Sequence, residues 1–358
     1  MFPRITLRPT NRGRIILPTK IIFAIGSLLF SAMSMATNNS PDFPQSSEVH
    51  RFVDEMVTQH GYPREQLEAL LAEARFLPEL EERVRKPAEA LPWYRYRKIF
   101  LKPARIDAGV AFWRTHRDIL ERAEEVYGVP PKIIVGILGV ETFFGKHKGK
   151  YPVLDSLVTL TFRNTRRTRF FRSELKQFLL LINEEGLDAH GLKGSYAGAM
   201  GLPQFISSSY RRYAVDFDGD SQRDLLDSMP DAIGSAAHYL KSHKWQRGRG
   251  IAIPVEVEKE QINHGLLMKK KGSKPHITFS VLKDHGVIAK ERISDDEQVA
   301  LIELETETGF SYWAGQQNFY VITRYNRSNL YAMAVYQLGE AIRERYLRGG
   351  ETPQDAIP

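Results

Sequence analysis

Glu141 is the residue whose position in this sequence points most directly to chemistry. It follows Ile134, Ile137 and Leu138 at helical spacing within PPKIIVGILGVETFFG, residues 130–145. Residues three and four positions apart share a helix face, so we expect the Glu141 side chain to point inward with these apolar residues. A carboxyl group in apolar surroundings has a raised pKa and can act as a general acid near neutral pH. A structural ion pair with an arginine elsewhere is the alternative.

A second candidate segment, GSYAGAMGLPQFISSSY, covers residues 194–210 and combines small residues with Ser195, Gln204 and Tyr210. This composition is typical of a closely packed turn that leads into a polar cleft. A tight contact between two helices would explain the same composition.

Several motifs, in this order along the chain, resemble the lytic murein transglycosylase B family: GVETFFG, LDSLVTLTF, TRRTRFF, LKGSYAGAMGLPQF, YAVDFDGD, DAIGSAAHYL and FYVITRYNRSNLYAMAVYQLG. The resemblance runs from about Phe52 to Leu347, and the shared order makes coincidence improbable. It implies an α+β, mostly α fold, with a goose-lysozyme-like core, an N-terminal helical lobe and a small inserted β lobe. It also implies a cleft for the glycan strands of peptidoglycan, as an enzyme of cell-wall turnover requires.

The resemblance assigns roles to individual positions. Glu141 matches the single catalytic acid and base of the family. The positions that match cleft or substrate-binding residues are Ser195, Gln204, Tyr239, Tyr325, Asn326, Tyr331, Arg166 and Arg167. Arginines suit the carboxylates of peptidoglycan stem peptides, and aromatic rings suit the apolar faces of sugars. Taken singly, a doubled arginine is more often a solvated helix face, and a helical tyrosine is more often part of the core.

The number of carboxylates decides which reaction is expected. Conventional retaining and inverting glycosidases use two, whereas the family pattern offers one. The nearest other candidate, Asp155, is better explained as a structural cap. The resemblance therefore implies that Glu141 protonates the glycosidic oxygen between N-acetylmuramic acid (MurNAc) and N-acetylglucosamine (GlcNAc), and then deprotonates the 6-hydroxyl, which leaves a 1,6-anhydroMurNAc end. A hydrolytic muramidase and a catalytically silent peptidoglycan-binding scaffold remain the alternatives.

The segment DFDGDSQRDLLD predicts a structural calcium site, and no cofactor is expected for catalysis. Oxygen-bearing side chains occupy loop positions 1, 3, 5, 7, 9 and 12 of a calcium-binding loop, namely Asp216, Asp218, Asp220, Gln222, Asp224 and Asp227. Ser221 stands where an EF-hand loop requires glycine. Because the family loop is irregular here, Asp231 competes with Asp227 as the last ligand. A solvated acidic turn is the alternative.

The N-terminus has the order of a secretory signal peptide, predicted for residues 1–36. Basic residues precede an apolar run, Ile21 to Met33, and a small-residue cleavage site, Ser34-Met35-Ala36. An uncleaved inner-membrane signal anchor is the alternative. Cleavage would remove five basic and no acidic residues, lowering the formal charge from +7 to +2. Nucleic acid is therefore not an expected partner.

The absence of cysteine excludes disulfides, thiol catalysis and a lipid anchor on an N-terminal cysteine. Together with the signal segment, it predicts a periplasmic protein that is soluble after processing. Its expected partners are glycan strands, with cell-wall synthesis proteins as further candidates.

Changes in the residue pattern along the chain predict how it divides into domains. We expect a flexible leader at 37–47, a helical lobe at 48–104, the first part of the catalytic core at 105–245, an inserted β lobe at 246–312, the last part of the core at 313–350, and a tail at 351–358. Within the β lobe, strands are predicted at 255–260, 276–282 and 298–305.

Overall fold

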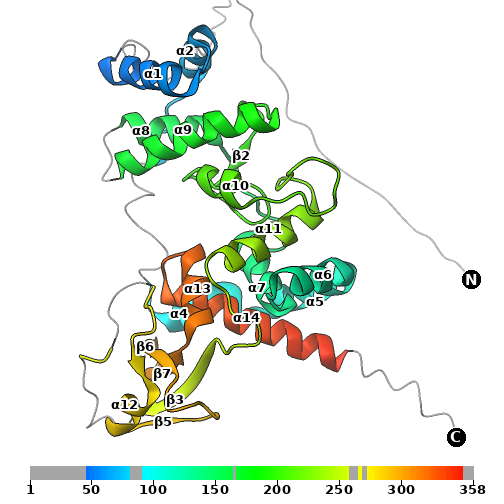
Figure 1. Cartoon of the computed structure of the whole chain (residues 1–358), viewed down its shortest axis with the longest axis vertical. Helices are drawn as coiled ribbons and strands as arrows, with labels where there is room; N and C mark the ends of the chain where they lie inside the picture. Colours follow the sequence, from blue (N-terminus) through cyan, green and yellow to red (C-terminus); the bar gives the residue numbers. More distant parts are fainter. Residues whose placement is uncertain (1–45, 81–90, 164–166, 258–264, 268–271, 350–358) are drawn as a thin grey trace, which may run out of the picture. The chain divides into compact units, whose positions relative to one another are not determined.

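The fold is described by a computed structural model that covers residues 46–80, 91–163, 167–257, 265–267 and 272–349. The predicted signal segment, nearly all of the predicted leader and the predicted tail lie outside these residues. The described part belongs to one compact unit of the chain, Asn38–Pro358. It is mostly helical with a small β-sheet, which confirms the predicted α+β class (Figure 1).

The helices of the described part are α1 Ser47–His60, α2 Arg64–Glu73, α4 Trp93–Phe100, α5 Pro103–Thr115, α6 Arg117–Tyr127, α7 Pro131–Thr142, α8 Val153–Phe162, α9 Thr168–Glu185, α10 Ser207–Tyr213, α11 Met229–Ser242, α12 Phe279–Asp284, α13 Gln317–Tyr325 and α14 Asn329–Arg348. The strands are β1 Tyr151–Pro152, β2 Lys193–Gly194, β3 Ala252–Val257, β4 Ile277–Thr278, β5 Val287–Ala289, β6 Gln298–Thr306 and β7 Gly309–Gly315.

The N-terminal hairpin of α1 and α2 is tied to α8 and α9. Glu55 of α1 pairs with Arg172 of α9 at 2.5 Å. The Arg75 backbone N–H, just after α2, donates to Asp155 Oδ1 of α8 at 3.0 Å. Burial raises the pKa of Asp155, and this hydrogen bond opposes the shift. Asp155 is therefore structural, although it joins two segments instead of capping its own helix.

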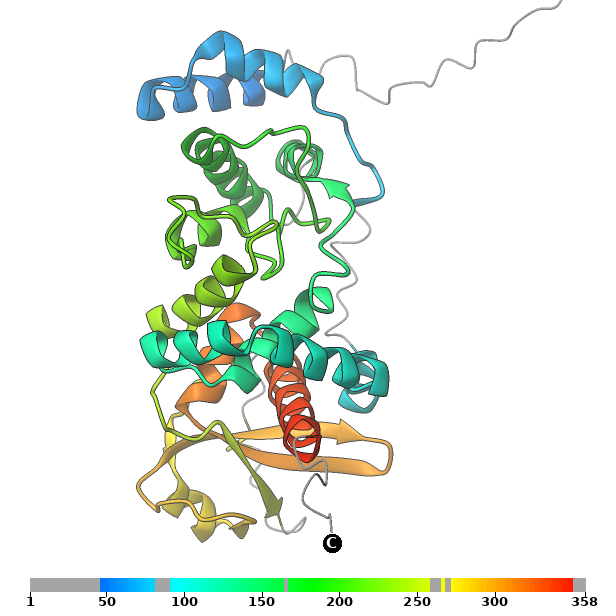
Figure 2. The same ribbon diagram turned by 90° about the vertical axis from the view of Figure 1, so that its right-hand side faces the viewer.

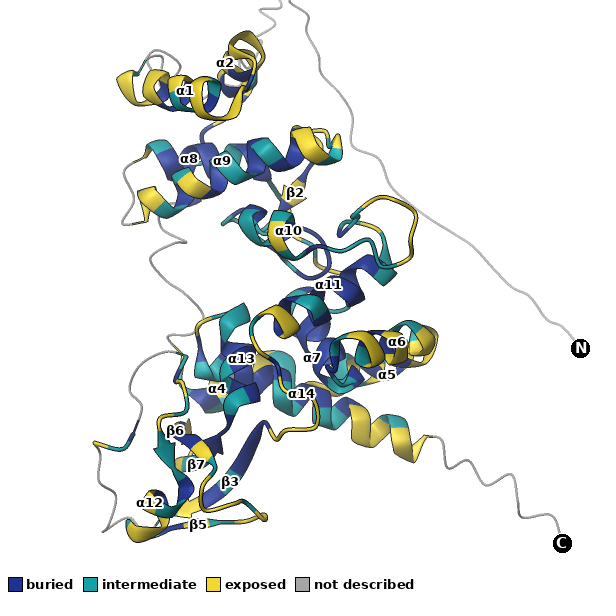
Figure 3. Cartoon of the chain, viewed as in Figure 1, coloured by how far each residue is buried: buried dark blue, intermediate teal, exposed yellow. Residues whose placement is uncertain are grey.

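Helix α7, which carries Glu141, is buried on nearly every side (Figure 3). A helix that is apolar all round belongs in a protein interior. Helices α5, α6, α11 and α14 pack against it. The helix predicted within residues 130–145 is thus confirmed as α7, which ends at Thr142, and its position explains why apolar residues continue beyond one face.

Helices α7 and α14 cross each other (Figure 2). They approach closely because a glycine of each helix lies against the backbone of the other. A Cβ atom added at Gly136 would lie 2.5 Å from the carbonyl oxygen of Val335, and one added at Gly339 would lie 2.2 Å from that of Lys132. Both distances are too short for a side chain. The crossing therefore depends on glycine at both contact points.

The β lobe is built on a five-stranded antiparallel sheet with the order β4-β6-β7-β3-β5. The predicted strand at 298–305 is confirmed as β6, and residues 255–257 of the predicted strand 255–260 belong to β3. The strand predicted at 276–282 is wrong beyond Thr278, because α12 begins at Phe279. Phe279 and Leu282, three residues apart, share the buried helical face and fill the core of the lobe.

The predicted domain boundaries stay predictions. Helix α4, which the sequence places in the N-terminal lobe, packs against β6 and α14. Strand β7 continues to Gly315, beyond the predicted end of the β lobe at residue 312. Within the ranges that the structure covers, no helix combines the length and the apolar character needed to span a bilayer.

Replacing Gly339 with alanine tests the helix crossing. We expect the free energy of unfolding to fall by about 1–3 kcal/mol, because the new methyl group collides with backbone that cannot rotate away. Chemical denaturation measures this change. The matched control is Glu344→Ala on the exposed side of the same helix, which should alter stability by less than about 0.5 kcal/mol. Equal effects of the two substitutions would show that the crossing has room for a side chain.

Candidate active site

The C-terminal end of α7 holds Glu141 next to two strained residues. Phe143 and Phe144 have φ angles of 52° and 57°, in the left-handed region that bulky residues rarely adopt. The Phe144 backbone N–H donates to the Leu138 carbonyl at 3.1 Å, and the Phe144 ring stacks on Phe112 at 5.3 Å between centroids. The surrounding contacts therefore impose a sharp helix end directly after Glu141.

Thr142, the residue between Glu141 and Phe143, links the end of α7 to the segment that contains Leu202. Its hydroxyl Oγ1 donates to the Leu202 carbonyl at 3.0 Å and accepts a hydrogen bond from the Gly145 N–H at 3.0 Å. Because Leu202 belongs to the predicted cleft segment 194–210, Thr142 joins this segment to the helix that carries Glu141.

Glu141 accepts a hydrogen bond from a buried tyrosine of α14. Tyr331 Oη donates to Glu141 Oε1 at 2.6 Å, and only 2% of Tyr331 is exposed. Burial raises the pKa of the Tyr331 phenol well above its ordinary value, and the Glu141 carboxylate raises it further. The phenol therefore stays protonated and remains a donor. Glu141 itself is half-buried, so its carboxyl group is oriented by the protein.

A cleft of about 890 Å³ lies beside Glu141. Six of the sequence-predicted binding residues line it: Arg167, Ser195, Gln204, Tyr239, Tyr325 and Asn326. Tyr331 is not among the lining residues, because it lies behind Glu141. Arg166 lies outside the described residues. Of the described residues that line this cleft, Glu141 is the only acidic one.

Ser195 and Gln204 are held by their own turn. Ser195 Oγ accepts a hydrogen bond from the Ala199 N–H at 3.0 Å. Gln204 has a φ of 51°, and its Nε2 donates to the carbonyls of Lys148 at 3.0 Å and Gly201 at 2.9 Å. The predicted closely packed turn is therefore present, and it presents both side chains to the cleft in fixed orientations.

Aromatic rings form one wall of the cleft. The Tyr239 ring lies 4.8 Å from the rings of both Tyr325 and Tyr213, and 4.2 Å from the stacked ring of His243. The Tyr239 hydroxyl donates to the Arg324 carbonyl at 2.6 Å. Burial raises the pKa of Tyr239, so it too stays neutral.

Sequence reasoning missed several residues that line the cleft: Phe170, Arg212, Tyr213, His243, Arg324 and Arg327. The spacing of His243, four residues after Tyr239 and directly after the end of α11, was a usable signal. Arg324 and Arg327 directly flank the Tyr325-Asn326 pair that the resemblance singled out. No comparable signal existed for Arg212 and Tyr213, because a separate helix brings them to the site.

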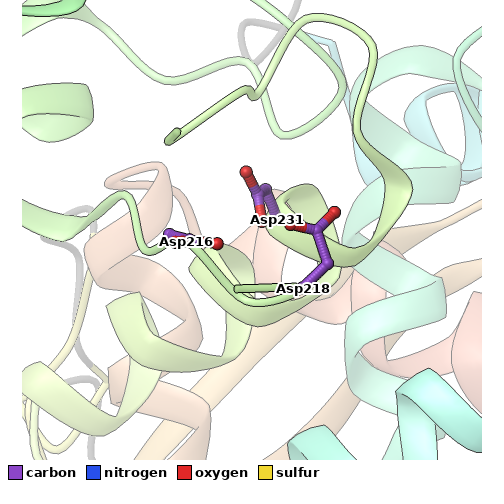
Figure 4. A group of neighbouring side chains, drawn as sticks. All are labelled: Asp216, Asp218 and Asp231. Carbon is purple, nitrogen blue, oxygen red and sulfur yellow. The ribbon is translucent and has the colours of Figure 1, made fainter. Parts of the chain in front are cut away.

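A second group of acidic side chains lies outside the cleft. Ligand oxygens of Asp216, Asp218 and Asp231 all lie within 4.8 Å of one another (Figure 4). Burial raises the pKa of Asp231, while hydrogen bonds from the N–H groups of Phe217 and Asp224 lower it and the two neighbouring aspartates raise it further. Gathered oxygen ligands whose charges repel one another fit a calcium ion.

Two other predicted ligands, Asp220 and Asp227, contact neighbouring protein groups instead. Asp220 Oδ1 accepts from the Gln222 N–H at 2.8 Å, which closes a turn. Asp227 pairs with Lys148 at 2.8 Å. Of the two alternatives for the last ligand, the structure brings Asp231 to the cluster and leaves Asp227 outside it. Asp231 is held there because it lies in the first turn of α11.

Comparisons with known proteins agree with this architecture. The family model described as "Transglycosylase SLT domain" matches residues 44–340. The "Membrane-bound lytic murein transglycosylase B" of Escherichia coli K12 is 40% identical over 327 residues, which cover 88% of each chain. The solved structure of catenated lytic transglycosylase SltB1 from Pseudomonas aeruginosa is 44% identical with a TM-score of 0.80, covering 85% of this chain and all of that one.

A further solved structure, that of the Escherichia coli lytic transglycosylase Slt35 in complex with calcium, is 42% identical with a TM-score of 0.78 and covers 86% of this chain and 96% of that one. Sequence, fold and the order of the cleft motifs all agree. The chain therefore belongs to the lytic murein transglycosylase B family.

Proposed function

We propose that this protein is a lytic transglycosylase that cleaves the β-1,4 bond between MurNAc and GlcNAc in peptidoglycan and leaves a 1,6-anhydroMurNAc end. The observation that carries the proposal is Glu141, the single acidic group among the described residues that line the cleft, which accepts a hydrogen bond from Tyr331. Membership of the lytic murein transglycosylase B family supports it.

The reaction needs one group that first gives and then takes a proton. Protonated Glu141 donates its proton to the glycosidic oxygen as the bond from that oxygen to MurNAc C1 breaks, and the acetamido group of the substrate stabilises the developing cation. Glu141, now ionised, takes the proton of the MurNAc 6-hydroxyl as O6 bonds to C1. No water is consumed, and Glu141 ends in its starting protonation state.

The remaining cleft residues hold the substrate for these steps. Ser195, Gln204 and Asn326 are proposed to orient the sugar through hydrogen bonds. Tyr239 and Tyr325 offer aromatic surface to its apolar faces. Tyr331 acts through Glu141 as a positioning residue. Fixed orientation of reacting groups can lower a barrier by about 7–11 kcal/mol in ideal cases, which favours attack by the tethered 6-hydroxyl over attack by bulk water.

Contact with the peptide stems is proposed for Arg167, together with Arg166. Arg167 lines the cleft, and its guanidinium group lies 4.1 Å from the Phe170 ring centroid. A planar guanidinium group stacked on a ring suits bidentate binding of a carboxylate.

A hydrolytic muramidase is the runner-up. A hydrolase of the retaining or inverting kind requires a second carboxylate at the scissile bond. The described part of the cleft lining offers none beyond Glu141, and Asp155 is engaged by the Arg75 N–H. The arrangement therefore favours the intramolecular reaction. A silent scaffold would have no need of the hydrogen bond from Tyr331 to Glu141.

We also propose a structural calcium ion at Asp216, Asp218 and Asp231. The convergence of three carboxylates supports it, as does the calcium complex of Slt35. The ion would neutralise their repulsion and fix the loop before α11, a helix whose Tyr239 lines the cleft. No cofactor is proposed for catalysis. The signal-like segment 1–36 supports a periplasmic location, which cell fractionation tests against an uncleaved membrane anchor.

Replacing Glu141 with glutamine tests the catalytic assignment. The amide keeps size and hydrogen bonding but has no transferable proton, so turnover of purified sacculi should fall by about 10²- to 10⁴-fold while glycan binding survives. Mass spectrometry of the released muropeptides should show anhydro ends from the native enzyme. The matched control, Asp155→Asn, should affect stability more than turnover. Reducing ends as the main product would falsify the transglycosylase proposal and support the muramidase.

Removing the Tyr331 hydroxyl tests the positioning role. Tyr331→Phe should lower kcat by about tenfold, comparable with the loss of one hydrogen bond to a charged group. KM should change little, because the ring is almost fully buried. The control is Tyr210→Phe, another buried tyrosine, whose hydroxyl donates to the Arg223 carbonyl at 2.6 Å; it should lower stability without changing kcat. A raised KM with an unchanged kcat would instead indicate direct substrate contact by Tyr331.

Calcium binding is tested by thermal unfolding. Adding millimolar calcium to chelator-treated protein should raise Tm, because an ion that binds only the folded state stabilises it. Asp218→Asn should weaken this response, whereas Asp227→Asn should preserve it. An unchanged Tm for the native chain would remove the proposed site, and a response lost only with Asp227→Asn would assign the last ligand to Asp227.

A further inference from the structure

Three arginines gather at the aromatic wall of the cleft. Arg212 comes from α10, Arg324 from α13, and Arg327 from the segment after α13, and all three line the cleft. Burial lowers the pKa of His243, and Arg324 and Arg212 lower it further. The Arg212 guanidinium lies 5.5 Å from the Tyr213 ring centroid, and the Tyr213 ring lies 5.1 Å from the His243 ring.

Arg324 and Arg327 also act on the pKa of Tyr239, another residue of the cleft lining. Burial and neighbouring Tyr213 raise the pKa of this phenol, whereas Arg324 and Arg327 lower it. Tyr239 stacks on His243, and both rings line the same cleft as the three arginines. His243 Nδ1 lies 2.8 Å from the Tyr239 carbonyl, and with its lowered pKa the ring adds no charge near neutral pH. The positive charge here therefore comes from the arginines.

These three arginines have no acidic partner within the described chain, unlike their neighbours. Arg211 pairs with Glu184 at 2.6 Å, and Arg223 pairs with Glu185. Arg212, Arg324 and Arg327 make no ion pair there. Positive groups that share one cleft repel one another, and an anionic ligand relieves that repulsion.

We propose that Arg212, Arg324 and Arg327 form a carboxylate-recognition site for the peptide stems of peptidoglycan, separate from Arg167. The inference rests on the proposed function, because it takes the glycan to lie across the aromatic wall. The saccharide rings match that wall but carry no charge, whereas the attached stems carry carboxylates. Arginine binds carboxylates through paired hydrogen bonds. The three arginines would therefore favour glycan strands whose peptide stems carry free carboxylates.

The test compares three forms of the same purified glycan strands: strands with intact stems, strands whose stem carboxylates have been converted to amides, and strands stripped of their stems. The amidated strands keep the length and bulk of the peptide but lose its charge. The native enzyme should cleave intact strands with a kcat/KM about tenfold higher than amidated ones, mainly through a lower KM. Raised ionic strength should reduce this ratio, because salt screens exposed charges.

The double variant Arg212→Gln, Arg327→Gln should bring the ratio close to one, and Arg212→Lys, Arg327→Lys should retain part of it. Arg292→Gln, an exposed change in the β lobe, is the matched control and should keep the native ratio. Both target arginines are exposed, so the double variant should fold, which circular dichroism checks.

Two results would overturn the inference while leaving the proposed function intact. One is a native-like ratio in the glutamine double variant. The other is a preference of the native enzyme for stripped strands, which would assign these arginines to the lactyl carboxylate that stripping exposes. Failure of the proposed function is distinguishable, because no anhydro ends would then form from any of the three substrates.

Discussion

The close crossing of α7 and α14 is the constraint on which the site depends. Gly136 and Gly339 let each helix rest on the other's backbone. That approach brings the Tyr331 hydroxyl within 2.6 Å of Glu141, although 190 positions separate these residues in the chain. Hydrogen bonds weaken steeply with small losses of distance and alignment. Packing along one stretch of the helix pair therefore determines the chemistry available at its end.

A buried carboxylate supports one of the helices that line the cleft. Glu174 of α9 accepts hydrogen bonds from the Ser208 N–H at 3.0 Å and from Ser208 Oγ at 2.7 Å, and burial raises its pKa. It holds α10, the helix that carries Arg212 and Tyr213, against α9. Glu174 thus supports an element of the cleft without lining it, whereas Glu141 lines the cleft.

Helical spacing was sufficient to predict α7 and to single out Glu141, because an inward carboxylate is conspicuous in an apolar pattern. The mostly helical class and β6 were equally visible. Other features depend on contacts between distant segments, which local patterns do not contain. The arginines of the cleft come from separate elements, and Asp231 joins its cluster because of where α11 begins. The left-handed Phe143 and Phe144 oppose local preference and exist only because surrounding contacts impose them.

The long separation of Glu141 and Tyr331 also orders events during folding. The β lobe lies between them in sequence, so the packing of α14 on α7 closes a long loop, and contacts that span long loops form late. Until then, the apolar faces of α7 lack their largest covering helix, so a partly folded chain exposes a surface prone to association. A chain in which α14 has not yet docked also lacks the hydrogen bond from Tyr331 to Glu141, so its active site is incomplete until these two helices meet.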